Sequence, residues 1–377
     1  MKIALVHEML IKLGGAEKVF EVWIHMFPDA DIFTLIYDEN QVGKVFPKEK
    51  IHPSVFWLRT QKVYKFLKKQ RFCLPFMAAS IESLDFSKYD LVLVSSSGFA
   101  HGVITKPESK TIVYYHAPAR YMWDWTNEYK RDIRAVKWIK AFLINSLFLK
   151  LRQWDYIASK RHDISLANSS TTQKRLKKYF RIDAEILYPP IETERFAKIL
   201  SQSFELPTQK PYYIILSALT EFKRIDIAIK NLKNTPHISL IVIGDGEYRK
   251  KLEEFSPATE NIFFVGKKFW DELVFLVQNA LGLIFPGEED FGIVPIEVMA
   301  AGKPVFALKK WGLTETVIED VTGAFFQNSD GSDFLENFEE FHIKNINGDF
   351  KKEICKEQAW KYDKKLFENE IFRLIGE

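Results

Sequence analysis

Two glutamates frame the segment of this chain that is best suited to chemistry. Glu289 and Glu297 lie eight residues apart in Phe285-Pro-Gly-Glu-Glu-Asp-Phe-Gly-Ile-Val-Pro-Ile-Glu-Val-Met-Ala-Ala-Gly302, where an apolar run, a Pro-Gly turn and a helical pattern follow one another. Pro295 suits a first helical turn, where its missing N–H costs nothing, and Gly302 suits the helix end. The free N–H groups and the dipole at such a helix start favour an anion or a sugar hydroxyl.

The spacing of these glutamates argues against a glycoside hydrolase. Eight residues of helix rise by about 12 Å, whereas the paired carboxylates of glycosidases lie roughly 5–9.5 Å apart. Two separate contacts to one extended ligand fit better. Glu297 stands between Ile296 and Val298, and a carboxylate in an apolar run needs a polar partner. The alternative is that Glu289 and Glu297 are ordinary acids of a helix start and a solvated helix face.

Cations and a histidine follow other predicted strands. Lys223 and Arg224 come after the strand predicted at Tyr212–Leu216, at a helix start where two cations oppose the helix dipole unless an anion binds. His116 follows the strand predicted at Thr111–Tyr115 and can hydrogen-bond a ligand beyond the carboxyl end of that strand. A solvated helix start and a structural histidine are the alternatives.

Glycine-rich turns follow further predicted strands. Gly14-Gly15 opens a helix after the first strand and permits close approach of a phosphate to the backbone. Gly244-Asp245-Gly246 is a turn at the end of the strand predicted at Ser239–Ile243. The alternative for Gly14-Gly15 is an ordinary loop-to-helix junction.

The elements that must position these residues form two α/β domains with doubly wound parallel sheets. Short apolar runs alternate with longer helical patterns in each half of the chain, which is typical of parallel α/β construction. Pro189-Pro190 interrupts the pattern as a linker would. We therefore expect an N-terminal domain over residues 1–190, a C-terminal domain over 191–359, and a helix over 360–377 that packs back on the first domain.

Composition narrows the class of protein. The 377 residues carry a net charge of +3 and two cysteines, Cys73 and Cys355, in no metal-ligand spacing. The first residues read as a strand, and the apolar run Ala141–Leu149 is far shorter than the ~20 residues of a membrane span. A cytoplasmic protein fits these features. No nucleic-acid-binding module is recognised.

Basic and aromatic residues gather in one part of the first half. Nine Lys and Arg and one acid, Glu49, occupy residues 44–71, interleaved with aromatic residues. This mixture favours an anionic membrane surface, and the stretch Lys137–Arg152 is a second candidate for such contact. The alternative is the solvated face of an amphipathic helix.

The motif Glu289-x7-Glu297, with Phe291-Gly292 and Ala300-Ala301-Gly302-Lys303-Pro304, resembles glycosyltransferase family 4. That family consists of retaining enzymes with two Rossmann-like domains facing each other across a cleft, the GT-B architecture. The resemblance implies that Glu289 contacts the donor sugar, that Glu297 contacts the ribose, and that the amides of residues 291–294 lie at the sugar and diphosphate.

The same resemblance extends along nearly the whole chain. The segment Tyr114–Asp124 is similar to the one that holds the family's active-site histidine, here His116, and it matches the O-antigen-type mannosyltransferase branch, as does Trp154-Asp155. The implied catalytic residues are His116, Glu289 and Lys223. The implied donor-binding residues are Gly14, Gly15, Ser217, Lys223, Arg224, Gly244, Val265, Gly266, Glu289, Asp290, Phe291, Gly292, Ile293, Val294 and Glu297.

Three positions depart from the family pattern or imitate another one. Ala218 stands where relatives carry an arginine five residues before the lysine, so one phosphate-neutralising charge is missing or comes from elsewhere. Trp311-Gly312 stands where relatives have Gly-Gly. Asp29-Ala30-Asp31 imitates the metal motif of other glycosyltransferases, but we interpret it as a turn and strand start, and expect neither metal nor cofactor.

The expected function is retaining hexosyl transfer from a nucleotide-diphosphate sugar. GDP-mannose is the first candidate donor and a UDP-hexose the second. The expected acceptor is a lipid-linked glycan of cell-surface polysaccharide synthesis, reached at the anionic inner face of the cytoplasmic membrane. A sugar-nucleotide epimerase and a non-catalytic nucleotide-sugar-binding protein remain as alternatives.

Overall fold

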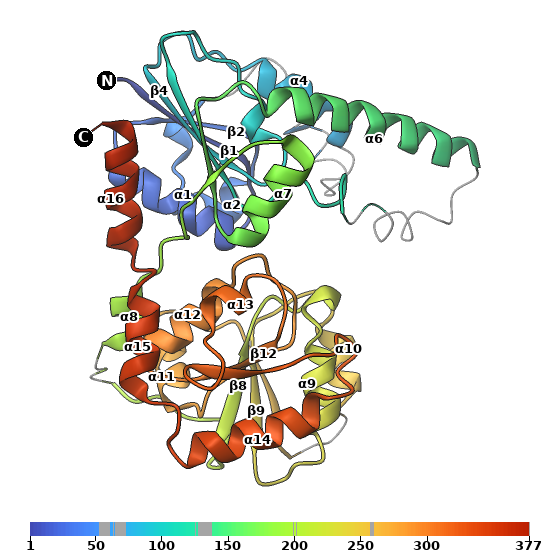
Figure 1. Ribbon diagram of the computed structural model, residues 1–377, viewed down its shortest axis with the longest axis vertical. Helices are drawn as coiled ribbons and strands as arrows, with labels where there is room; N and C mark the ends of the chain where they lie inside the picture. Colours follow the sequence, from blue (N-terminus) through green and yellow to red (C-terminus); the bar gives the residue numbers. More distant parts are fainter. Residues whose placement is uncertain are drawn as a thin grey trace. The chain divides into compact units, whose positions relative to one another are not determined.

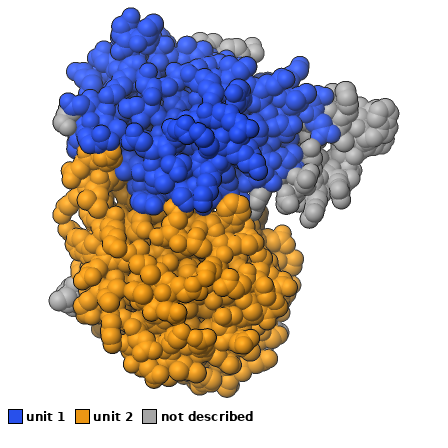
Figure 2. All heavy atoms as spheres, in the orientation of Figure 1, with its two compact units in different colours: residues 1–188, 371–377 blue, residues 189–370 orange. Residues whose placement is uncertain are grey.

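The computed structural model describes residues 1–52, 61, 62, 64, 73–124, 126, 138–198, 200, 202–256 and 260–376. The chain forms two compact units, residues 1–188 with 371–377 and residues 189–370 (Figure 2). The first division falls between Tyr188 and Pro189, directly before the double proline. The second unit extends to Glu370, beyond the end at residue 359 that the sequence suggested.

Unit 1 is built on a seven-stranded parallel sheet with the strand order β3-β2-β1-β4-β5-β6-β7 (Figure 1). The central strands are buried on both faces, which is why their sequences are continuous apolar runs. Its strands are β1 (Ile3–Leu10), β2 (Asp31–Tyr37), β3 (Ile51–His52), β4 (Leu91–Ser96), β5 (Lys110–Tyr115), β6 (Ile164–Ala167) and β7 (Glu185–Ile186).

The helices of unit 1 follow the strands in the alternating order of a doubly wound fold. The main ones are α1 (Gly15–Met26), α2 (Glu39–Val42), α4 (Leu74–Glu82), α6 (Trp138–Ala158) and α7 (Ser170–Phe180). Ser169 caps α7 by accepting a hydrogen bond from the Thr172 N–H.

Unit 2 is built on a six-stranded parallel sheet with the order β10-β9-β8-β11-β12-β13. Alternate residues of these strands, such as Tyr213, Ile215 and Val242, belong to one buried apolar cluster with the phenylalanines of a covering helix. Its strands are β8 (Tyr212–Leu216), β9 (Ser239–Ile243), β10 (Ile262–Gly266), β11 (Leu283–Phe285), β12 (Val305–Leu308) and β13 (Gly323–Phe326).

Helices cover both faces of this second sheet (Figure 1). One group packs into the cluster just described: α9 (Ile225–Leu232), α10 (Arg249–Glu254) and α14 (Phe334–Ile346). The other helices, which contact one another through α8 and α12, are α8 (Thr193–Ala197), α11 (Trp270–Asn279), α12 (Ile293–Ala300), α13 (Leu313–Thr316) and α15 (Lys352–Trp360).

The strand order of each sheet reverses once. The reversal lies between β1 and β4 in unit 1 and between β8 and β11 in unit 2. Ligands of doubly wound sheets bind outside the carboxyl ends of the strands at this switch point. The loops after β1, β4, β8 and β11 are therefore the places to examine for a site.

The helix expected over residues 360–377 is α16 (Lys364–Ile375). It begins after a bridge between Ile191 and Asp363, and the preceding helix, α15, ends at Trp360. The end of α16 belongs to unit 1, where Lys110 Nζ donates to the Leu374 carbonyl at 2.6 Å.

The predicted α/β class with two parallel-sheet domains is confirmed. In the ranges given above, no helix is long and apolar enough to cross a membrane. Much of the basic and aromatic segment after Lys44 lies outside the described residues, namely 53–60, 63 and 65–72, as does the part of the second candidate stretch before Trp138.

Candidate active site

Lys223 and Glu289 form an ion pair at the switch point of unit 2. Lys223 lies in the loop after β8, and Glu289 lies in the turn after β11, the neighbouring strand across the reversal. Gly287 makes this approach possible, because a Cβ at that position would lie 2.9 Å from the Lys223 carbonyl oxygen. Two residues that the sequence analysis selected separately are thus brought together by the topology.

This ion pair is accessible to a ligand. The Lys223 side chain is 14% exposed and the Glu289 side chain 31% exposed. The Lys223 ammonium also lies 5.3 Å from the ring centre of Phe222 and 5.9 Å from that of Phe285. An entering phosphate group can therefore reach Lys223 and replace the Glu289 carboxylate as its partner, which leaves Glu289 free to accept from a hydroxyl.

The helix start beside this pair has the geometry expected of an anion site. Helix α12 begins at Ile293, two residues before Pro295, with Gly292 in the left-handed region at φ 90° as its N-cap. The first N–H groups of a helix have no intrahelical acceptor. Phe291 is buried with its ring 5.5 Å from that of Tyr362, which holds the turn against the end of α15. Glu297 is 7% exposed on α12.

Glycines pack the loops after β8, β9 and β10 together. Gly244 has φ 138°, and a Cβ there would lie 1.8 Å from the Ser217 carbonyl oxygen. A Cβ at Gly246 would lie 2.2 Å from the Leu219 carbonyl oxygen. The Gly244 N–H donates to the Gly266 carbonyl at 2.9 Å. Only glycine fits this arrangement, so Gly244 and Gly246 have a structural function beside any contact with a donor.

Arg224 is held by the protein rather than aimed at the Lys223–Glu289 pair. Its Nη1 donates to the Ser329 carbonyl at 2.7 Å and its Nε to Asp226 at 3.3 Å. Arg224 itself has φ 50° and serves as the N-cap of α9. The structure therefore accounts for this cation at a helix start by protein contacts.

Lys310 is a cation beside the candidate site that the sequence analysis missed. It follows β12, the strand next to β11, and its Nζ donates to Glu288 Oε1 at 3.0 Å and to Ser329 Oγ at 2.5 Å. Because Ser329 also accepts from Arg224, these two cations converge near the turn after β11. The signal was available in the sequence, since Lys310 follows a predicted strand as Lys223 does.

The single glycine of the loop after β12 is the one that packing requires. A Cβ at Gly312 would lie 2.3 Å from the Asp290 carbonyl oxygen, and the Gly312 N–H donates to the Glu289 carbonyl at 3.1 Å. Trp311 adopts φ 54° and donates through Nε1 to Glu288 at 2.9 Å. The departure from the Gly-Gly pattern is therefore accommodated by a tryptophan in a left-handed conformation.

His116 ends a chain of polar side chains in unit 1. Its Nε2 lies 2.8 Å from Ser95 Oγ, which lies 2.9 Å from Nδ1 of His7, and His7 Nε2 lies 3.8 Å from Glu17. These side chains come from the ends of β4 and β5, from β1 and from α1. They meet at the switch point of this sheet, so the histidine is positioned by three elements other than its own.

The surroundings of these polar side chains determine the charge of His116 and of Glu17, which lie at the two ends of the series. Burial lowers the pKa of His116 to about 3, and the neighbouring His7 adds to this shift, so the imidazole is neutral near pH 7. Burial alone would raise the pKa of Glu17, but the hydrogen bond and charge of His7 outweigh it and lower that pKa. Glu17 is therefore a carboxylate, and His116 acts as a neutral hydrogen-bonding group.

Gly14 does not offer its N–H group to a phosphate in this structure. That N–H donates to Glu17 Oε2 at 3.0 Å in a capping box at the start of α1. Gly14 and Gly15 line a cavity of about 300 Å³ together with His7 and Glu17. The predicted phosphate contact at Gly14 would therefore need Glu17 to give up its bond to that N–H.

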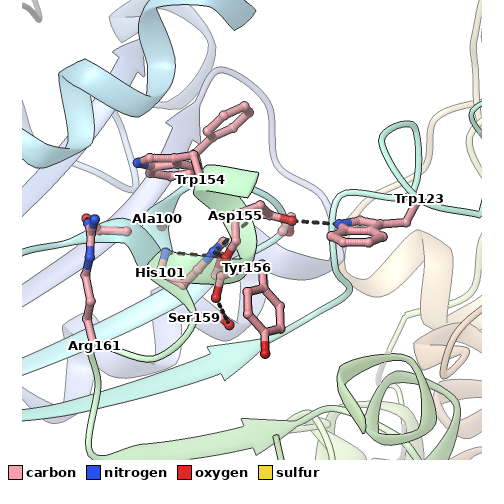
Figure 3. Close-up of polar contacts among 12 residues, drawn as sticks. Ala100, His101, Trp123, Trp154, Asp155, Tyr156, Ser159 and Arg161 are labelled. Carbon is pink, nitrogen blue, oxygen red and sulfur yellow. Dashed lines mark hydrogen bonds and ion pairs between the residues drawn. The ribbon is translucent and has the colours of Figure 1, made fainter. Parts of the chain in front are cut away.

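The motifs that resemble the mannosyltransferase branch have a structural role within unit 1. Trp123 Nε1 donates to Asp155 Oδ2 at 2.7 Å, and Asp155 Oδ1 lies 3.2 Å from Nε2 of the buried His101 (Figure 3). Asp124 pairs with the buried Arg175 at 3.1 Å. These contacts fasten the segment after His116 to α6 and α7, so the residues Trp123-Asp124 and Trp154-Asp155 stabilise the site rather than form it.

Asp31 is the first residue of β2, as the sequence interpretation expected. Its carboxylate accepts from the Tyr89 hydroxyl at 2.6 Å and lies 2.7 Å from His52. Burial alone would raise the pKa of Asp31, but the contacts with Tyr89 and His52 outweigh burial, so the pKa of Asp31 is lowered. Among the described residues, no group of three His, Cys, Asp or Glu side chains is placed to hold a metal ion.

The predicted site residues thus form two groups. His116, Gly14 and Gly15 lie in unit 1, and all the others lie in unit 2 around the ends of β8, β9, β10 and β11.

Comparison with known proteins supports the family resemblance. Residues 197–359 match the model of glycosyl transferases group 1. The chain is 22% identical to the human alpha-1,3/1,6-mannosyltransferase ALG2 over 71% of this chain and 68% of that protein. It is 26% identical to the O-antigen chain mannosyltransferase RfbU of Salmonella typhimurium over 46% of this chain and 49% of that protein. An uncharacterized glycosyltransferase of Methanocaldococcus jannaschii is 30% identical over a matched segment that covers 39% of this chain and 44% of that protein.

Solved structures share the fold. Anabaena HepE in complex with UDP and glucose superposes with a TM-score of 0.69 at 14% identity, covering 100% of this chain and 99% of that one. WaaG, a glycosyltransferase involved in lipopolysaccharide biosynthesis, superposes with a TM-score of 0.66 at 14% identity, covering 99% of both chains. The predicted resemblance to GT-B glycosyltransferases is confirmed, including mannosyltransferases among the relatives.

Proposed function

We propose that the chain is a retaining, metal-independent hexosyltransferase, and the premise is that residues 197–359, within its second unit, match the model of glycosyl transferases group 1. It moves a sugar from a nucleotide-diphosphate donor to a lipid-linked or polysaccharide acceptor. The observation that carries the proposal is the Lys223–Glu289 pair at the switch point of the second sheet, beside the start of α12.

The donor binds along this edge of unit 2. Its diphosphate takes Lys223 as its counter-ion and the first N–H groups of α12 as hydrogen-bond donors. Glu289, released from Lys223, accepts from a hydroxyl of the sugar, and Glu297 accepts from the ribose. Lys310 and Arg224 both contact Ser329 and supply positive charge near the turn. They take the place of the arginine that relatives carry at the position of Ala218.

The chemical step breaks the bond between the anomeric carbon and the diphosphate oxygen. The acceptor oxygen forms its bond to the same carbon from the same face, and its proton passes to a diphosphate oxygen. Negative charge grows on the leaving diphosphate, so prearranged positive groups stabilise the transition state more than the ground state. His116 of unit 1 is proposed as a further catalytic residue, which acts through hydrogen bonds because its imidazole is neutral near pH 7.

GDP-mannose is the donor we propose first. The support is the similarity to mannosyltransferases in sequence, with ALG2 and RfbU among the relatives. A UDP-hexose is the second candidate, because HepE, which has the same fold, was crystallised with UDP-glucose. One hydroxyl contact is enough to decide between such sugars.

The acceptor proposal rests on charge and on relatives. We place the acceptor at the inner face of the cytoplasmic membrane, where the basic and aromatic segment after Lys44 would contact anionic lipid. The protein should co-sediment with vesicles that contain phosphatidylglycerol, and increasing salt should weaken this association. Failure to bind at every salt concentration would remove the membrane part of the proposal.

Donor binding and turnover test the proposal. The purified chain is mixed with GDP-mannose, UDP-glucose, UDP-galactose and UDP-GlcNAc, and both thermal stabilisation and slow release of nucleotide diphosphate are measured. One donor should stabilise the protein and be hydrolysed without added metal, in the presence of a chelator. Stabilisation without turnover favours a nucleotide-sugar-binding protein, and conversion of UDP-GlcNAc to its epimer without acceptor favours an epimerase.

A further inference from the structure

A lysine-lined cavity lies on the other side of unit 2 from the apolar cluster that contains Tyr213, Ile215 and Val242. Its volume is about 770 Å³, and four lysines line it: Lys198, Lys303, Lys352 and Lys356. They come from the ends of α8 and α12 and from the first turns of α15, which Figure 1 shows on one side of the second sheet. We call this space the lysine cavity. It is confined to residues of unit 2.

The charge of the lysine cavity is not compensated. No aspartate or glutamate is among its lining residues, as far as the described chain shows. Lys198 pairs with Asp271, but Lys303, Lys352 and Lys356 make no ion pair with any described residue. Three ammonium groups therefore converge on one space without an acid between them.

This arrangement costs free energy in the empty protein. Lys352 and Lys356 are four residues apart on one face of α15, where like charges repel. Burial lowers the pKa of Lys303, and the nearby charge of Lys352 lowers it further. Gly302 brings Lys352 in, since a Cβ at that glycine would lie 2.3 Å from the Lys352 Cγ atom. A bound anion would offset each of these costs.

The cavity also has an apolar wall. Phe196, Phe275 and Ala301 line it beside the lysines, so one molecule can meet both charge and apolar surface there. Sites of this size, with a few charged groups and apolar walls, suit small organic ligands.

We propose that the lysine cavity binds a molecule that carries a phosphate or diphosphate group, with that group between Lys303, Lys352 and Lys356 and its organic part against Phe196 and Phe275. The cavity is separate from the donor site. Gly292 and the donor turn lie at the start of α12, whereas Ala301 and Lys303 lie past its end, and an eight-residue helix is about 12 Å long. The proposal therefore stands independently of the proposed function.

The first test measures binding of inorganic pyrophosphate by calorimetry. All proteins carry Lys223→Ala, which removes the diphosphate contact of the donor site. Lys352→Gln with Lys356→Gln should weaken pyrophosphate binding at least tenfold. The matched control, Lys361→Gln with Lys365→Gln, removes the same charge from exposed lysines just beyond α15 and should change affinity less than twofold. Equal affinities in both variants, or equal losses, would overturn the proposal.

A second variant separates binding from folding. Lys303→Met keeps the side-chain volume and removes a partly buried charge, so it should raise the melting temperature of the ligand-free protein and abolish the added stabilisation by pyrophosphate. A variant that melts at a lower temperature and still gains the full stabilisation by pyrophosphate contradicts the proposed role of Lys303.

Vesicles distinguish the two sources of the phosphate group. If a lipid headgroup occupies the cavity, Lys352→Gln with Lys356→Gln should reduce co-sedimentation with phosphatidylglycerol vesicles, and pyrophosphate should displace the parent protein from them. If the ligand is soluble, both proteins should sediment alike while pyrophosphate affinity still differs tenfold. Each of these results supports the site. If the double variant loses neither pyrophosphate binding nor vesicle binding, the proposal is refuted.

Discussion

Replacing Lys223 by alanine should slow sugar transfer far more than it destabilises the protein. The substitution deprives the departing diphosphate of the cation that lies against Glu289 at the switch point. Removal of a single prearranged group that stabilises developing negative charge costs about 3–4 kcal/mol, or roughly a hundred- to thousandfold in kcat. We expect kcat to fall within this range at saturating donor.

The same substitution should change the free energy of unfolding much less. Lys223 and Glu289 remain 14% and 31% exposed, and partly solvated ion pairs contribute about 1 kcal/mol or less. A change of this size shifts the melting temperature of a domain of this size by roughly 2–4 °C. Circular dichroism melting and release of nucleotide diphosphate, measured on the same preparation, separate the two effects.

Two matched variants test the reasoning. Lys344→Ala removes a partly exposed lysine on α14 that pairs with Asp320 and Glu340, and it should leave kcat unchanged. Lys223→Arg keeps the positive charge and should recover part of the lost rate. If Lys223→Ala raises KM while kcat stays the same, the lysine binds the donor uniformly in the ground state and transition state. Near-normal values of both constants would refute its role altogether.

Three further predictions follow from the described contacts. The pKa of His116 is lowered to about 3, below its ordinary value of 6.5. Between these two pH values the unfolded chain binds a proton at this histidine that the folded protein does not bind. Stability therefore falls as the pH drops through this window. His116→Gln should therefore reduce the loss of stability between pH 6.5 and 4.5 by about 2 kcal/mol, measured by urea unfolding, and an unchanged loss would contradict the shifted pKa. Asp155→Ala should destabilise unit 1 by about 3–5 kcal/mol, because it removes the acceptor of the Trp123 Nε1–H group and the carboxylate beside buried His101, whereas exposed Asp320→Ala should have little effect on unfolding. Gly244→Ala should destabilise unit 2 by about 3 kcal/mol, since its Cβ would lie 1.8 Å from the Ser217 carbonyl oxygen. The control is Gly348→Ala, which should cost only about 1 kcal/mol, because Gly348 has φ 77° but no atom within 4 Å of an added Cβ. Equal effects of the two substitutions in thermal melts would refute the packing argument.

Local patterns were enough to predict the strands and the sites where they end. The apolar runs that became β4, β5, β8 and β9 are buried on both faces, which makes them continuous and easy to recognise in the sequence. Two edge strands, β3 and β13, were not predicted. Strand β3 has only two residues, which are too few to carry a periodic signal. The start of α12 was predicted near Pro295 and lies at Ile293, which Gly292 determines through its left-handed conformation.

Strand order was beyond the reach of these local patterns, and it decides which loops meet. The sequence selected Lys223 and Glu289 as separate contacts, and only the pairing of β8 with β11 places them side by side. It also selected Arg224, but its side chain is taken by Asp226 and Ser329, a residue more than a hundred positions away along the chain.

By itself, then, the sequence determined the α/β class, the two sheets, the strand-end turns and the resemblance to a glycosyltransferase family, because each of these depends on residues close together in the chain. The tertiary structure alone decided the partners of those residues. The chain from Glu17 through His7 and Ser95 to His116, and the lysine cavity between α8, α12 and α15, join elements that are distant in sequence. Such contacts depend on how helices and strands pack against one another, and the packing of a whole sheet is not encoded in any one segment.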